Sequence, residues 1–122
     1  MVVADARSRI KELDGARDAV RSFSVMFEPL DFSGELAEEI VGIGDELERL
    51  GAAIKLVAAR RVEETGHHEH QGDKSAGRWL ARKTGESEGA SIAELETLKA
   101  AERHPVVESA LRRGELSTGR AR

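Results

Sequence analysis

Residues 74–122 read KSAGRWLARKTGESEGASIAELETLKAAERHPVVESALRRGELSTGRAR, and this stretch decides the expected fold. Apolar residues recur in it at three- and four-residue spacing, which is typical of amphipathic helices. Small and polar residues separate the helical segments. The predicted helices are 75–83, 87–103 and 105–114. The short connection at 84–86 joins the first two helices in the order of a helix-turn-helix unit.

Each of these helices has a start or stop signal in the sequence. Ser75 and Ser87 are predicted N-caps, and Pro105 suits a first helical position because its missing N–H has no partner there anyway. Gly114 is placed to end the helix that begins at Pro105, and Ser117 is predicted to cap a further helix. The residues expected to face inward are Trp79, Leu80, Ile92, Leu95, Leu98, Val106, Val107, Ala110 and Leu111.

The composition favours helices throughout. The 122 residues suit one domain, or a small domain with an extension, and aromatics are limited to three Phe and one Trp. A core built from Leu, Ile, Val and Ala therefore predicts an all-α fold. The absence of Cys excludes disulfides and thiolate metal sites. With no apolar run of about 18 residues and no signal-peptide pattern, we expect a cytoplasmic protein without membrane contact.

The first half of the chain predicts a long antiparallel helical hairpin. Helices are expected over 3–27 and 33–65, with a break at Glu28-Pro29 and a stop at Gly66. The second helix carries apolar residues at alternating spacings of four and three, a heptad seam sustained for about three heptads. The seam residues are Leu36, Ile40, Ile43, Leu47, Leu50, Ile54 and Val57.

Two partners suit this seam. It can close on helix 3–27 of the same chain, or part of it can pair with a second copy as a homodimer. Arg17 and Ser24 interrupt the matching stripe of the first helix, which leaves room for the dimer. The expected organisation is a hairpin arm over 1–66, a polar linker over 67–74, and a helix-turn-helix-like module over 75–122 that looks truncated.

The linker contains the cluster His67, His68 and His70, which resembles a set of metal ligands. A zinc site would need a further ligand such as Glu64 or His104, and glycines loosen the segment. We therefore favour a polar linker whose charge changes near neutral pH, and we expect no metal site and no cofactor.

Charge is uneven along the chain, whose net charge is −4. Residues 75–122 hold nine Lys/Arg and seven Asp/Glu, so the C-terminal part is mildly basic and the rest is acidic. Lys74 and basic side chains of this C-terminal part are candidates for DNA phosphate contact, and the competing interpretation is an ordinary solvated face with Glu partners. The candidate DNA-binding residues are Lys74, Arg78, Arg82, Lys83, Arg112 and Arg113.

One ordered series of residues carries a family resemblance: Ser75, Trp79-Leu80-Ala81, Thr84-Gly85, Ser87, Pro105, Ala110-Leu111, Gly114-Glu115-Leu116-Ser117 and Ala121. The series resembles the actinobacterial domain of unknown function 222, a mycobacterial repeat family usually found before an HNH endonuclease domain. Arg60-Arg61, near the end of the long helix, also fits that family, and the resemblance spans about residues 34–122. The end of the chain is also similar to the helix-turn-helix region of the partition protein ParB.

The resemblance implies DNA-related work in bacteria or their phages, with two departures. The chain holds no nuclease domain, and segment 88–97 is acidic where related sequences tend to be rich in Arg. We therefore expect a non-catalytic DNA-associated module, without catalytic residues since the chain has no Asn, no Cys and no HNH motif. The alternative is a protein-interaction or regulatory module that acts through the heptad seam and the acidic helix.

Overall fold

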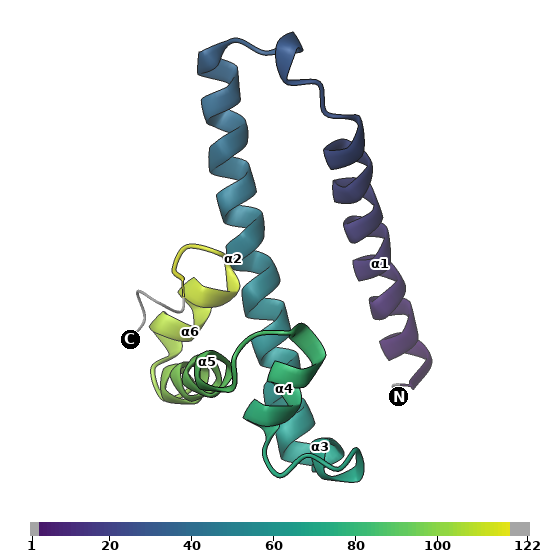
Figure 1. Cartoon of the computed structure of the whole chain (residues 1–122), viewed down its shortest axis with the longest axis vertical. Helices are drawn as coiled ribbons and strands as arrows, with labels where there is room; N and C mark the ends of the chain where they lie inside the picture. The colour runs from purple at the N-terminus through teal and green to yellow at the C-terminus, as the bar shows by residue number, and fades with distance from the viewer. Residues whose placement is uncertain (1–2, 118–122) are drawn as a thin grey trace. The chain divides into compact units, whose positions relative to one another are not determined.

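The computed structural model describes residues 3–117, with side chains from Asp5 onward, and every regular element in that range is a helix (Figure 1). The predicted all-α fold is confirmed for these residues. The chain divides into two compact units, Met1–Glu39 and Ile40–Arg122, and the division falls inside the longest helix. None of the helices in the described part is long and apolar enough to cross a membrane.

The first unit contains α1 (Val3–Met26), the short 3-10 helix η1 (Pro29–Asp31) and the start of α2. The predicted break is confirmed: the side chain of Glu28 accepts a hydrogen bond from the backbone N–H of Leu30 and caps η1. Phe27 stacks on Phe23, with ring centroids 5.6 Å apart, and lies 5.3 Å from the ring of Phe32. None of the side chains described between residues 5 and 39 is buried.

The long helix α2 (Gly34–Thr65) contains 32 residues. It begins where predicted, because the Oγ of Ser33 accepts a hydrogen bond from the backbone N–H of Leu36 at 3.2 Å. It ends where predicted as well, since Gly66 adopts the left-handed conformation with a φ of 72°. At about 1.5 Å per residue, such a helix extends beyond the core of a small domain.

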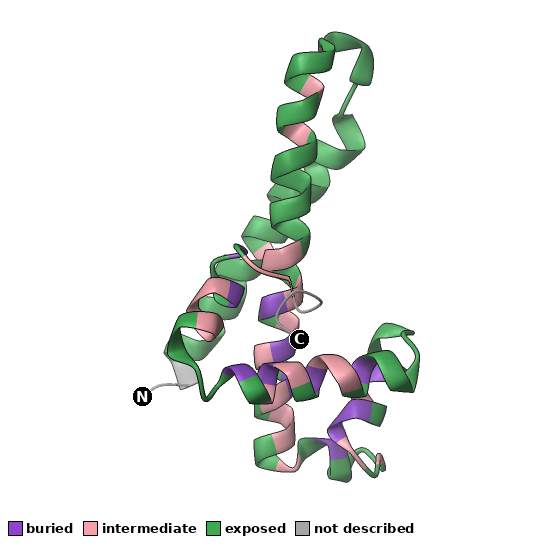
Figure 2. Cartoon of the chain, turned by 90° about the vertical axis from the view of Figure 1, so that its left-hand side faces the viewer, coloured by how far each residue is buried: buried purple, intermediate pink, exposed green. Residues whose placement is uncertain are grey.

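In the second unit four shorter helices follow α2: α3 (His67–His70), α4 (Ala76–Thr84), α5 (Glu88–Ala101) and α6 (Pro105–Arg112). Ser75 and Ser87 cap α4 and α5 as predicted, each accepting a backbone N–H on its side chain. Gly85 forms the turn between them with a φ of 80°. The buried residues gather here (Figure 2), and the core cluster consists of Leu56, Ala59, Ala76, Leu80, Leu95 and Leu98.

Two expected core residues are exposed, and for Val106 the prediction is wrong. Val106 is 81% exposed because α6 is short and turns only the side that carries Leu111 into the core. Ile92 is 41% exposed, yet its inner atoms cover the backbone of α4 at Gly77. Trp79 is half-buried beside the core. The helix predicted after Ser117 lies outside the described residues.

The segment 67–74, predicted as a polar linker, is exposed at most positions, and it contains the short helix α3 and one buried side chain. His68 is buried at 7% exposure, and its carbonyl oxygen accepts backbone hydrogen bonds from Gln71 and Asp73. The Nε1 of Trp79 donates to the Oε1 of Gln71 at 2.8 Å. The hydrogen bond from Trp79 joins the segment to α4, and the polar composition of the segment does not predict such a contact.

Candidate interaction surfaces

The seven seam residues form what we call the α2 stripe: Leu36, Ile40, Ile43, Leu47, Leu50, Ile54 and Val57. None of them is buried. Ile43 is 58% exposed, Leu36 48%, Ile54 47% and Leu47 41%. Figure 2 shows the first half of α2 almost entirely in the exposed colour. A large apolar side chain with so much solvent contact is a candidate for burial against a partner.

The C-terminal part of the stripe is covered on one side only. Leu50 lies beside Gly114, where an added Cβ would approach the Cγ of Leu50 to 2.9 Å. The Nε of Arg49 donates to the carbonyl oxygen of Gly114 at 2.5 Å and fastens the end of α6 to α2. Val57 packs against the core cluster. The stripe therefore contributes to the fold at this end.

An open groove remains on the same face of α2. Its apolar surface comes from the third and fourth turns before the end of the helix, and its charges are two arginines from different helices. The lining residues are Ala53, Ile54, Val57, Ala58, Arg61 and Arg112. We call it the α2 groove. The sequence predicted Ile54 and Val57 as seam residues but gave no signal that α6 brings Arg112 to their side.

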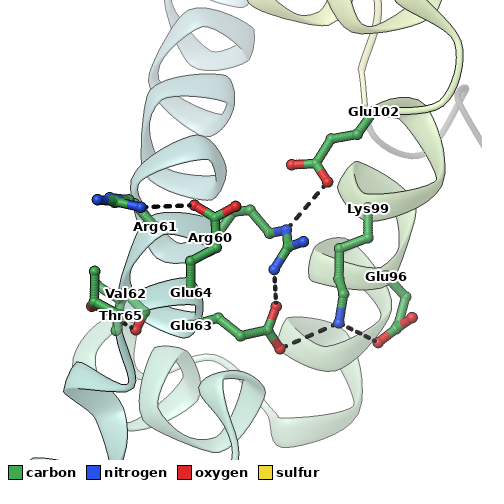
Figure 3. A network of polar contacts seen from close by, with 9 residues as sticks. All are labelled: Arg60, Arg61, Val62, Glu63, Glu64, Thr65, Glu96, Lys99 and Glu102. Carbon is green, nitrogen blue, oxygen red and sulfur yellow. Dashed lines mark hydrogen bonds and ion pairs between the residues drawn. The ribbon is translucent and has the colours of Figure 1, made fainter.

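A network of ion pairs joins α2 to α5 (Figure 3). Arg60 donates to Glu102 at 3.2 Å and to Glu63 at 2.9 Å, and the Nζ of Lys99 lies 3.2 Å from the second oxygen of Glu63. The hydrogen bond to Glu102 is the main cause that raises the pKa of Arg60. These side chains are partly buried, so the network orients α5 on α2 and is structural.

The candidate DNA-binding residues divide into paired and unpaired side chains. Arg78 pairs with Glu88 at 3.2 Å, Arg82 with Asp73 at 2.7 Å, and Arg113 with Glu115 at 3.2 Å. Lys74, Lys83 and Arg112 are exposed and make no ion pair within residues 3–117. Because half of the predicted basic surface is already compensated by carboxylates of the same chain, its attraction for phosphate is reduced.

Asp73 is the carboxylate most affected by these pairings. The hydrogen bond from Arg82 lowers the pKa of Asp73 below its ordinary value, against the opposing effect of desolvation. The same hydrogen bond raises the pKa of Arg82. The pair joins the end of segment 67–74 to α4, because Asp73 precedes the cap residue Ser75 and Arg82 lies in the last turn of α4.

We expect Asp73→Asn to change the acid side of the stability profile. A carboxylate with a lowered folded pKa stabilises the fold above the ordinary aspartate pKa of about 3.9 and loses this contribution as the pH falls through the folded pKa. The free energy of unfolding, measured with urea from pH 7 to pH 3, should therefore fall less in the variant than in the wild type. Asp31→Asn, at an exposed position in η1, is the control, and its free energy of unfolding should change with pH as in the wild type. Parallel acid profiles for Asp73→Asn and wild type would contradict the expectation.

The histidine cluster does not assemble a metal site in the described part of the chain. His68 is buried, whereas His67 and His70 are exposed, and His67 contacts Gln71. Within those residues, no group of three or more His, Asp or Glu side chains is placed to hold a metal ion.

Comparison of the chain with protein-family models, with curated proteins and with solved structures found no match.

Proposed function

We propose that this chain is a non-catalytic helical interaction module of a bacterial or phage DNA-related protein, and that the α2 stripe is its binding surface. The observation that carries the proposal is the exposure of apolar residues at heptad spacing on a single helix, with Ile43 at 58% and Leu47 at 41%. The DNA-related setting is what the family resemblance implies.

The energetic argument favours a helix as the partner. Removing a Leu or Ile side chain from water stabilises a complex by about 1.5–3 kcal/mol when burial is complete. A stripe that alternates spacings of four and three presents these side chains to another helix along its whole length. A flat or extended partner would meet only part of the stripe.

The charge around the α4–α5 turn also favours a protein partner. Glu88 lies in the first turn of α5, the helix that would enter the groove of DNA in a helix-turn-helix unit, and it pairs with Arg78. No Lys or Arg precedes Lys99 on α5. The negative charge of Glu88 at the start of α5 repels the phosphates of DNA.

The test is binding of a fluorescein-labelled synthetic helix that carries Leu at heptad spacing and Lys on its flanks. Such a probe matches the apolar stripe and the carboxylates beside it. We expect saturable binding in dilute solution, lost in Ile43→Asn. Val41→Asn is the matched control, because Val41 is also apolar and exposed on α2 but lies off the stripe. Equal binding by both variants, or no binding by the wild type, would reject the proposal.

Direct DNA contact is a second candidate function, favoured by one observation. Lys74 lies before α4 and Lys83 in its last turn, both without an ion pair in the described structure, and α4 is joined to α5 by a tight turn. Fluorescence anisotropy of labelled duplex DNA at about 50 and 200 mM salt tests it, since phosphate contacts weaken steeply with salt. Salt-sensitive binding that Lys74→Glu with Lys83→Glu abolishes would support DNA contact. No binding at the lower salt concentration would reject it for this chain.

A further inference from the structure

The end of α1 and the turn that follows it carry large apolar side chains that the unit Met1–Glu39 does not bury. Four of them between 23 and 30 are more than half exposed. They are Leu30 at 91%, Met26 at 81%, Val25 at 77% and Phe23 at 55%. We call these four residues the turn patch. Neighbouring apolar side chains with so much solvent contact are a candidate binding surface.

Contacts within the turn hold the patch in one arrangement as the chain passes through η1 (Figure 1). The ring of Phe27 stacks on Phe23 and lies against the ring of Phe32, so the end of α1 is joined to the residue after η1. The backbone N–H of Phe32 donates to the carbonyl oxygen of Pro29 at 3.2 Å. Leu30 therefore extends from a closed turn, and a partner that covers it has little backbone to order on binding.

The turn itself does not use the side chain of Leu30. Its backbone N–H donates to the carboxylate of Glu28 at 3.1 Å, and any residue with a backbone N–H would make this bond. A polar side chain at this position would meet water more favourably than an isobutyl group does. The apolar side chain contributes to stability only when a partner removes it from water.

The charged side chains of this part of the unit are all acidic. From 22 to 39 there are five carboxylates and no Lys or Arg. They are Glu28, Asp31, Glu35, Glu38 and Glu39. None of the five forms an ion pair with a residue of the described range 3–117. Arg21, the cation that precedes the patch, lies 3.6 Å from Asp18 and is already paired. The negative charge of the segment is therefore uncompensated.

We infer that the turn patch binds a basic amphipathic segment of another protein, with large apolar side chains on one side and Lys and Arg around them. The apolar side of such a segment covers the patch, and its cations meet the free carboxylates. The flexible thioether of Met26 adapts to apolar side chains of different shapes. The ring of Phe23 adds attraction for a Lys or Arg that lies over its face. The patch shares no residue with the α2 stripe and is a second surface beside it.

The charge opposes two other occupants. The same patch of a second copy would bring carboxylates against carboxylates, and like charges side by side oppose association. Phosphates of a nucleic acid or of an anionic membrane would meet the same repulsion. A basic protein segment is the occupant that satisfies both the apolar and the charged part of the surface.

The test is binding of fluorescein-labelled synthetic helices to the full chain. The basic probe carries Leu on one face and Lys and Arg on the other, and the acidic probe has Glu at every basic position. We expect saturable binding of the basic probe, weaker at about 200 mM salt than at about 50 mM, because salt screens exposed charges. The acidic probe should not bind. Equal binding of the two probes, or no binding of the basic probe, would overturn the inference.

Leu30→Asn locates the binding site. It should weaken binding of the basic probe about tenfold or more, because Leu30 is the most exposed side chain of the patch and loses its burial in the complex. Val106→Asn is the matched control, since Val106 is also aliphatic and 81% exposed but lies in the other unit. Both variants should keep the circular dichroism of the wild type. Unchanged binding by Leu30→Asn, or an equal loss in Val106→Asn, would overturn the inference.

Charge reversal tests the carboxylates separately from the apolar side chains. Asp31→Lys combined with Glu35→Lys should weaken binding of the basic probe and reduce its salt dependence. Glu12→Lys combined with Glu69→Lys changes the net charge of the chain equally, at exposed positions outside 22–39, and should bind nearly as the wild type does. Equal binding by the two double variants would show that the carboxylates near the patch do not attract the probe, and would overturn the inference.

The patch and the α2 stripe can fail separately. Binding of the basic probe that is lost in Ile43→Asn but unchanged in Leu30→Asn would assign the site to the α2 stripe, which overturns this inference and supports the proposed function. Binding that is lost in Leu30→Asn but kept in Ile43→Asn supports the turn patch.

Discussion

Leu56→Ala is expected to lower the free energy of unfolding by about 2–5 kcal/mol, the range for removing a buried Leu side chain from a close-packed core. Leu56 is 1% exposed and lies in the core cluster with Leu80, Leu95 and Leu98, so it joins α2 to α4 and α5. The lost methyl groups leave a cavity that helices fixed by caps and turns at both ends cannot fill by moving. In a chain with so small a core, this is a large share of the stability.

Urea denaturation followed by circular dichroism measures the effect. The midpoint should fall while the slope of the transition stays the same, as for a change in stability rather than in compactness. Val106→Ala is the matched control, because it also removes methyl groups from an aliphatic side chain, but at a position that is 81% exposed. It should change stability by less than about 0.5 kcal/mol. A loss in Leu56→Ala no larger than in this control would show that Leu56 is not part of the stabilising core.

Helix boundaries were predictable because the signals for them are local. Ser33, Ser75 and Ser87 cap the helices that follow them, and Gly66 ends α2, each through the backbone geometry of its own few residues. The core residues Leu80, Leu95 and Leu98 follow from helical spacing in the same way. A cap or an amphipathic face requires only neighbours in the sequence, so one sequence is enough to place it.

The tertiary contacts were less predictable because they depend on which face of each helix meets another. Val106 has the same apolar character as Leu111, yet only Leu111 is buried on the short helix α6. Buried His68 lies in a segment whose composition predicts a solvated linker. The pairing of Arg82 with Asp73 and of Arg78 with Glu88 determines how much positive charge α4 offers, and neither pair follows from helical periodicity.

The exposure of the α2 stripe could not be predicted for the same reason, because it depends on which helix faces meet. Its heptad spacing was evident in the sequence, but the spacing predicts only that a helix is its partner, not which helix. The structure adds that residues 50–57 contact the C-terminal helices on one side and leave the α2 groove open on the other. The proposed binding experiment therefore uses Ile43, which lies outside the part of the stripe that packs on the C-terminal helices.

Gly77→Ala is expected to destabilise the second unit by about 1–3 kcal/mol, as overpacking of a well-packed site does. A Cβ added at Gly77 would lie 2.4 Å from the Cγ1 of Ile92 and 3.3 Å from its Cα. The Cα belongs to the backbone of α5, so α4 and α5 must separate to make room. This loss exceeds the gain of about 1 kcal/mol that Ala usually brings over Gly inside a helix.

Gly42→Ala is the control that isolates this contact. Gly42 also lies inside a helix, and nothing is within 4 Å of its added Cβ, so the substitution should stabilise by about 0.5–1 kcal/mol. Adding Ile92→Ala to Gly77→Ala removes the nearest atom, and in a double-mutant cycle the cost of Gly77→Ala should then fall. If instead the two Gly→Ala variants stabilised the protein equally, α4 and α5 would not meet at Gly77, and the close approach that joins the two helices after the Gly85 turn would be refuted.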